Sequence, residues 1–473
     1  MKSICFTLSV ISLAATACIS AKANPIKTEL AYALLNNPQL AASRHAWNSA
    51  QSRAKAAEAS RLPTFNLGYD YGKERINTLA LNNAGSIGGN TSLLTGPSPA
   101  GWNWSQENRR GFSVNSQLPV YNGGKIAAQV DTALLDATIA DLNAQGTEQD
   151  TLLEAITSYL GVAKAKTLIE LARQNEETTT RQLELETKRL EAGGGVKVDA
   201  MQAQTRLQIV RERAVYYNQM LREAIARYEQ TFGKVPDLTT IQDLDIQEDA
   251  IPVTVVSALH QASENNPRLR AAVLMVERAE HQVTIAQSAT KPAVDIVGTI
   301  NRTNNTMQTS QKEEGALYLR ASWSINMGGE AFKREQAAAA DSMEARSKAD
   351  VTLSKINESV RIAWNQVVNG KERLQLLANA ANISRNVMTD RKILRDAGKE
   401  TALAALDAEV EYYGVLSNKV NSMYDTRIGA YRLMASMGKL SAENLGLDAE
   451  FKLPVKPLSV DIEALAKVGN SIK

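Results

Sequence analysis

Residues 36–40 read Asn36-Asn37-Pro38-Gln39-Leu40, and the pattern returns 229 residues later as Asn265-Asn266-Pro267-Arg268-Leu269. Further along the chain, Gly123-Gly124 is matched by Gly328-Gly329 at an offset of 205 residues. The offsets differ by 24 residues, which places one longer loop in the first copy, before Gly123. Asn-Asn-Pro and Gly-Gly in register indicate an internal repeat rather than chance matches between Ala-rich helices. The chain is therefore predicted to consist of two related halves.

Each half is predicted to begin with a helix and two strands. In the first half an Ala-rich helical pattern covers residues 28–61 and stops at Pro63. Apolar and polar side chains then alternate, which is the period-2 pattern of a strand. The four strands are expected near residues 64–75, 110–120, 293–303 and 315–327, with loops at 76–110 and 302–314. Each strand is about ten residues long, enough to cross a bilayer as a tilted barrel strand.

Two very long helices are predicted to complete each half. After the strand-to-helix turns at Gly123-Gly124 and Gly328-Gly329, a helical pattern continues to turns at Gly193 and Gly398, and then reverses. A run of nearly 70 helical residues is on the order of 100 Å long. Small and apolar residues recur in these helices at the alternating spacing of three and four that is typical of a coiled coil. Charged stretches such as residues 181–191 are expected to be solvated helix faces.

The N-terminus has the features of an export signal. Lys2 precedes an apolar run over residues 4–19, and Ala21-Lys22-Ala23 is an A-x-A cleavage pattern. A short buried helix and lipoprotein processing at Cys18 are the alternatives. Cleavage after Ala23 would remove both cysteines and leave 51 basic and 51 acidic residues. The expected division is a signal peptide at 1–23, repeats at 24–234 and 252–440, a linker at 235–251 and a C-terminal equatorial or tail segment at 441–473.

Composition and motifs argue against several classes of protein. The 473 residues have a net charge of only +2 and no basic stripe, so a nucleic-acid partner is not expected. The three histidines are scattered, which predicts no metal site. The glycine runs lack a complete phosphate-binding pattern, so no cofactor is expected. No acid–base or nucleophile constellation stands out, and the chain is not expected to be an enzyme.

Four amphipathic strands cannot close a barrel, because the smallest barrels need about eight. An open sheet in lipid would leave unpaired backbone groups at its edges. The pattern therefore favours several copies that share one barrel, with helices too long to pack on so small a sheet. The alternatives are a soluble sheet packed on helices and a periplasmic coiled-coil scaffold.

The chain resembles the TolC-type outer membrane channels over nearly its whole length. The resemblance depends on Asn37-Pro38, Leu62-Pro63, Tyr121-Asn122-Gly123-Gly124, Ala192-Gly193, Ala397-Gly398 and the repeat itself. It implies an α+β membrane protein in the outer membrane of a Gram-negative bacterium. The expected assembly is a homotrimer with a twelve-stranded barrel in the outer membrane lipid and a coiled-coil helical tunnel in the periplasm.

The resemblance also implies partners and a cargo. Such channels dock to a periplasmic membrane-fusion adaptor and to an energised inner-membrane transporter. Residues 361–365 (Arg-Ile-Ala-Trp-Asn) and 430–440 resemble the branch that serves type I secretion of large adhesins, in which the transporter is an ABC transporter. The alternative is a drug or metal efflux channel that works with a proton-driven pump.

Within this family, acidic residues after the second hairpin turn constrict the periplasmic end. The resemblance assigns Asp407 to one aperture position, whereas Ala404 stands where another aspartate is often found. Glu400 occupies a position that can be arginine, and Asp199 is the counterpart on the first hairpin. The hairpin turns at Gly193 and Gly398 are the expected adaptor docking points. The alternative for all three acids is a solvated carboxylate on a helix face.

Overall fold

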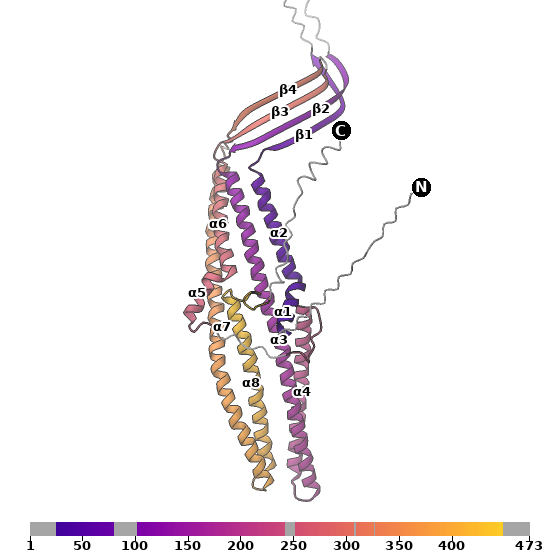
Figure 1. Cartoon of the computed structure of the whole chain (residues 1–473), viewed down its shortest axis with the longest axis vertical. Helices are drawn as coiled ribbons and strands as arrows, with labels where there is room; N and C mark the ends of the chain where they lie inside the picture. Colours follow the sequence, from indigo (N-terminus) through magenta and orange to yellow (C-terminus); the bar gives the residue numbers. More distant parts are fainter. Residues whose placement is uncertain (1–24, 80–101, 242–250, 307–308, 326, 448–473) are drawn as a thin grey trace, which may run out of the picture. The chain divides into compact units, whose positions relative to one another are not determined.

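The computed structural model describes residues 25–79, 102–241, 251–306, 309–325 and 327–447 (Figure 1). The first predicted repeat contains α1 (Pro25–Asn36), α2 (Pro38–Ala59), β1 (Thr64–Leu79), β2 (Trp102–Tyr121), α3 (Lys125–Glu191) and α4 (Lys197–Phe232). The second contains α5 (Val255–Asn265), α6 (Pro267–Ser288), β3 (Ala293–Thr306), β4 (Thr309–Ser322), α7 (Glu330–Asp396) and α8 (Ala402–Ser436). The predicted signal peptide, part of the linker and residues 448–473 lie outside the described ranges. Within those ranges, no helix combines the length and apolarity needed to cross a membrane.

The first helix of each repeat is broken, which the single predicted helix over residues 28–61 did not anticipate. The break lies between α1 and α2, and again between α5 and α6. Asn266 is extended, and its side-chain oxygen accepts hydrogen bonds from the backbone N–H groups of Arg268 (3.0 Å) and Leu269 (3.3 Å). Pro267 follows at the first helical position, where its missing N–H costs nothing. The Asn-Pro pair of the repeat therefore starts a new helix.

The strands form one antiparallel sheet in the order β1-β2-β3-β4 (Figure 1). They differ in length from the prediction. The β1–β2 ladder continues to the pair Leu79–Trp102 and the β3–β4 ladder to Thr306–Thr309, so the described residues of both expected loops are strand. β4 ends at Ser322 rather than near residue 327. Polar segments extend the ladders because backbone pairing does not require apolar side chains.

One face of this sheet is apolar and exposed. The side chains of Phe65, Leu67, Tyr69 and Tyr71 in β1 are 64–73% exposed. The register places Leu67 opposite Val114, which in turn lies opposite Ile300. A monomeric soluble protein rarely exposes such a contiguous apolar surface, whereas a lipid-facing strand must.

The described chain forms two compact units, each of which takes segments from both repeats. Unit 2 consists of residues 39–147 and 259–359 and contains the sheet. In this unit α3 packs against α6 through Ile139, Leu142 and Ala271. An ion pair between Arg278 and Asp136 (2.5 Å) also joins these two helices.

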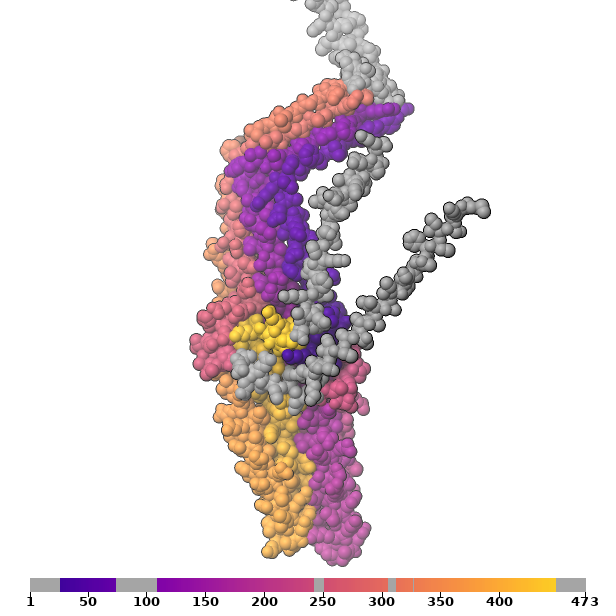
Figure 2. All heavy atoms as spheres, viewed as in Figure 1, coloured from indigo at the N-terminus to yellow at the C-terminus, as the bar shows by residue number. Residues whose placement is uncertain are grey.

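Unit 1 consists of residues 1–38, 148–258 and 360–473, of which 25–38, 148–241, 251–258 and 360–447 are described. It contains the ends of both hairpins, α3–α4 and α7–α8, and their two turns lie at the same end of the unit (Figure 1). Leu168, Ala172 and Tyr217 form a buried cluster between α3 and α4, and Val420 of α8 packs against it. The side chains of the two hairpins form one continuous surface within this unit (Figure 2).

Candidate functional site

The two hairpin turns of unit 1 have a common backbone geometry. Gly193 has φ of 77° and Gly398 has φ of 69°, a left-handed conformation that glycine adopts without steric cost. After α7, the N–H of Lys399 donates to the carbonyl of Leu394, and that of Gly398 donates to the carbonyl of Arg395. The same two bonds recur after α3, so both helices end in a Schellman motif. At the strand-to-helix turns φ is 65° at Gly123, 89° at Gly124 and 70° at Gly329, which follows Gly328.

Asp407 lies in the first turns of α8 and contacts the other hairpin. Arg206 of α4 donates from Nη2 to its Oδ1 at 2.7 Å. The Arg206 and Asp407 side chains are 35% and 53% exposed. This ion pair joins α4 to α8 at a solvated position.

Glu400 and Asp199 have separate surroundings. Glu400 precedes α8 and accepts a hydrogen bond from Nη1 of Arg391 at 2.9 Å, while its second carboxylate oxygen is buried without a hydrogen-bond partner among the described residues. Asp199 lies in the first turn of α4, where the helix dipole favours an acidic side chain. No hydrogen bond or ion pair among the described residues joins any two of Asp199, Glu400 and Asp407.

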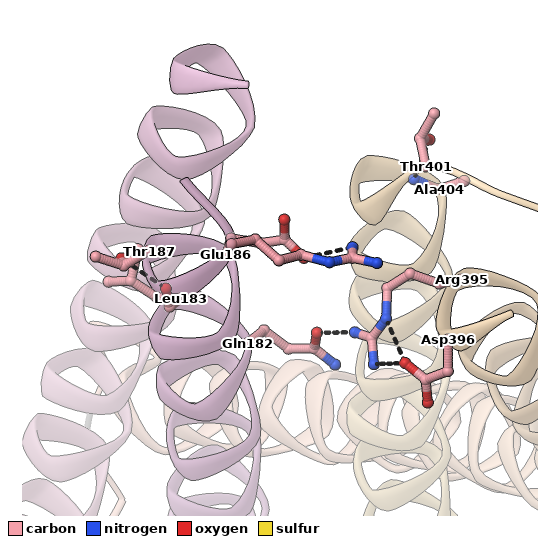
Figure 3. A network of polar contacts seen from close by, with 9 residues as sticks. Gln182, Leu183, Glu186, Thr187, Arg395, Asp396, Thr401 and Ala404 are labelled. Carbon is pink, nitrogen blue, oxygen red and sulfur yellow. Dashed lines mark hydrogen bonds and ion pairs between the residues drawn. The ribbon is translucent and has the colours of Figure 1, made fainter. Parts of the chain in front are cut away.

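A buried polar junction joins the two hairpins near these acids (Figure 3). Gln182 of α3 donates from Nε2 to Oε2 of Glu409 in α8 at 3.5 Å, and accepts a hydrogen bond from Arg395 of α7 through Oε1. Arg395 also donates to Oδ1 of Asp396 from Nε (3.1 Å) and Nη2 (2.8 Å). Glu409 is 1% exposed, and Gln182 and Arg395 are buried as well.

The sequence did not indicate this junction. Residues 181–191 were expected to form a solvated face, and most of them are exposed, but Gln182 and Glu186 are buried. Glu186 accepts a hydrogen bond from Arg189 at 3.5 Å. Polar side chains on a long helix have no local signal that tells a buried face from a solvated one, because a second hairpin decides which face it covers.

Burial raises the pKa of Glu409 above that of an ordinary glutamate. The positive charges of Lys392 and Arg395, and the hydrogen bond from Gln182, oppose this shift in pKa. Burial also raises the pKa of Tyr413, one turn further along α8, whose hydroxyl lies 3.4 Å from that of Thr178 in α3.

Two of the three histidines have a carboxylate neighbour. Nδ1 of His281 lies 3.9 Å from a carboxylate oxygen of Asp131, and Nδ1 of His260 lies 3.4 Å from one of Glu264. In the described part of the chain, no group of three or more His, Cys, Asp or Glu side chains is placed to hold a metal ion.

Residues 30–234 and 258–439 match the sequence profile of a family described as outer membrane efflux protein. The chain belongs to this family. The outer membrane efflux proteins are passive channels of the outer membrane rather than enzymes, and the sequence resemblance to TolC-type channels is confirmed. The two matched stretches lie within the two predicted repeats.

Among its curated relatives is the outer membrane efflux protein BepC of Brucella suis biovar 1, to which this chain is 22% identical over 375 residues. The match covers 77% of this chain and 80% of BepC. The chain is 23% identical over 420 residues to the outer membrane protein TolC of Vibrio cholerae serotype O1. This match covers 87% of this chain and 90% of that protein. The chain is 21% identical over 320 residues to the alkaline protease secretion protein AprF of Pseudomonas aeruginosa, covering 66% of each.

The expected fold is confirmed by solved structures. The outer-membrane channel OprN superposes with a TM-score of 0.74 over 88% of this chain and 90% of its own, at 18% identity. The four-stranded sheet and the long helical hairpins of this chain therefore form a TolC-type fold.

Proposed function

We propose that this channel is the exit duct of a tripartite export system for a secreted protein, with a large adhesin as the expected cargo. A periplasmic membrane-fusion adaptor would connect it to an inner-membrane ABC transporter that supplies the energy. The observation that carries the type I secretion assignment is the similarity to AprF, whose name describes protease secretion. Residues 361–365 and 430–440, which resemble the adhesin-exporting branch, support the same cargo class.

The sheet supports the proposed assembly. Its apolar face is exposed in the single chain, and β1 and β4 are edge strands. Three copies that pair β4 of one chain with β1 of the next would form a twelve-stranded barrel without open edges. The apolar side chains would then contact lipid.

The hairpin ends would form the periplasmic aperture and the adaptor docking site. Asp407, Glu400 and Asp199 lie near these ends, and three copies of an acid around a narrow pore favour cations. Docking at the turns around Gly193 and Gly398 is supported by exposed apolar side chains beside the first turn, at Val196, Val198 and Met201.

A drug or metal efflux channel that works with a proton-driven pump is the second candidate. The similarity to BepC, named an efflux protein, favours it. The long hairpins suit either role, because a passive duct takes its cargo from the transporter it is connected to.

Deletion of the gene in its own bacterium separates the two candidates. We expect the deletion strain to lose one or more large proteins from the cell surface and medium, and to keep its resistance to drugs and metal ions. The wild-type gene on a plasmid should restore secretion. Unchanged surface and secreted proteins together with increased drug or metal sensitivity would overturn the secretion assignment in favour of efflux.

A further inference from the structure

Glu409 is an acidic side chain buried at the contact between the two hairpins of unit 1. Its side chain is 1% exposed, and its hydrogen bond from Gln182 is long, at 3.5 Å. The other carboxylate oxygen, Oε1, is buried and has no hydrogen-bond partner in the described part of the chain. An ionised carboxylate in this position has lost its hydration and regained little of it from the protein, whereas a neutral carboxyl group tolerates the site better.

The basic groups around Glu409 are only partly available to it. Arg395 of α7 directs its donors to Gln182 and Asp396 (Figure 3). Lys392, one turn before Arg395 on α7, opposes the rise in the pKa of Glu409 through its positive charge. On this side of the contact, therefore, Glu409 has positive neighbours but no direct ion pair among the described residues.

The remaining polar groups are provided by the other helices. From α3 come Gln182 and, one turn further, the buried Glu186, which accepts from Arg189. On α8, Tyr413 lies one turn after Glu409, and the negative charges of Glu409 and of Glu177 in α3 each raise the pKa of Tyr413. From α4, Arg206 is engaged with Asp407, two residues before Glu409.

We propose that Glu409 is a proton-responsive lock between the α3–α4 and α7–α8 hairpins. When its carboxyl group is neutral, α8 stays packed on Gln182 of α3. When the group is ionised, the buried charge draws water into the contact and loosens it. The inference concerns the hairpin contact itself, so it does not depend on whether the cargo is a protein or a small molecule.

The direction of the pH effect follows from burial. Burial raises the pKa of Glu409 in the packed state above its value in the opened, hydrated state. The packed state therefore binds the proton more tightly, and its extra stability is complete below the ordinary pKa of about 4.3. That stability is lost as the pH rises through the raised pKa. The contact should be tight in acid and looser near neutral pH.

Amide hydrogen exchange of the complete trimer in detergent, at fixed salt and several pH values between 5 and 8, tests the lock. After correction for the intrinsic effect of pH on exchange, peptides covering residues 402–416 should lose protection as the pH rises. The expected loss is up to about tenfold for each pH unit by which burial raises the pKa. Peptides of unit 2 should show no such trend.

Three variants decide between the lock and a general effect of pH. Glu409→Gln keeps the shape without a charge, so protection should stay high at every pH. Glu409→Met should behave in the same way, and it replaces Glu409→Gln if that variant does not form trimers. Glu411→Gln removes an exposed charge from the same helix and should keep the wild-type pH dependence. A wild-type pH trend in the uncharged variants, or protection that rises with pH in the wild type, would overturn the proposal.

Discussion

Gly193 and Gly398 end the two longest helices with positive φ angles of 77° and 69°. A Cβ at either turn would meet no atom of the described residues within 4 Å, so glycine is required there by the backbone conformation and not by space. An L-residue in the left-handed region costs roughly 1–2 kcal/mol, and asparagine less than alanine.

We therefore expect Gly398→Ala to destabilise the α7–α8 turn by roughly 1–2 kcal/mol, and Gly398→Asn by less. Amide exchange of peptides around residues 390–405 should show about a tenfold loss of protection in the alanine variant. Gly414→Ala, within α8, is the control, because its added Cβ also meets open space but its backbone is helical. Equal losses in Gly398→Ala and Gly414→Ala would contradict the conformational explanation.

The ion pair between Arg206 and Asp407 leads to a second prediction about single residues. An exposed ion pair contributes about 0–1 kcal/mol, so Asp407→Asn should leave the trimer and its thermal stability almost unchanged. If Asp407 lines the aperture, the same variant should reduce cation selectivity in planar bilayers. The exposed Glu411→Gln should leave selectivity as it is. Unaltered selectivity in Asp407→Asn would remove this residue from the proposed aperture.

At the scale of elements, α7 and α8 approach closely at two glycines. A Cβ on Gly370 would collide with Oγ1 of Thr426 and come within 3.1 Å of its Cγ2. A Cβ on Gly429 would lie 3.1 Å from the side chain of Gln366. Small residues therefore decide how closely this antiparallel pair packs.

Gly370→Ala should destabilise the α7–α8 pair by about 1–3 kcal/mol, because the collision forces the helices apart. The thermal midpoint of the purified trimer measures the effect, and Gly414→Ala should instead leave it unchanged or raise it. Adding Thr426→Ala to Gly370→Ala removes both colliding atoms and should recover part of the loss. Failure of this second substitution to recover any stability would show that the close approach is not the cause.

At the scale of the whole molecule, the exposed apolar face of the sheet is of a kind that soluble single chains rarely have. The protein should fractionate with outer membranes, and it should run as a trimer on an unheated detergent gel and as a monomer after boiling. The control variant Gly414→Ala should fractionate and run on the gel in the same way as the wild type. Recovery of the wild type as a soluble monomer would contradict the assembly.

The elements followed from local patterns in the sequence, with two kinds of error. Alternation of apolar residues located all four strands, and the paired glycines located the turns. The strand ends were wrong where Asn-, Ser- and Glu-rich segments continue the ladder, since pairing there depends on the partner strand. The helix breaks before Pro38 and Pro267 were missed, although the Asn-Pro motif contains a signal for them, because proline favours the first helical turn and asparagine the cap.

The site was less predictable than the fold. The resemblance to TolC-type channels indicates Asp407, Glu400 and Asp199, and their placement near the hairpin ends follows from their short separation from the turns. Arg206 as the partner of Asp407 lies 201 residues away in sequence, and Gln182 lies 227 residues from Glu409. No local pattern reports on pairs at such separations.

The repeat, the sheet strands and the long hairpins were predictable from the sequence alone, because hydrophobic periodicity and turn residues act over a few neighbouring positions. The channel family was indicated by the resemblance of motifs across both halves. Which helix faces meet was decided only in the tertiary structure. The packing of α8 against α3 buries Gln182, Arg395 and Glu409, and the burial of Glu409 changes an ordinary glutamate into a group whose charge matters to the fold. Burial is a property of the packed hairpins, since the energy of a charge depends on the water and partners that the rest of the chain leaves to it.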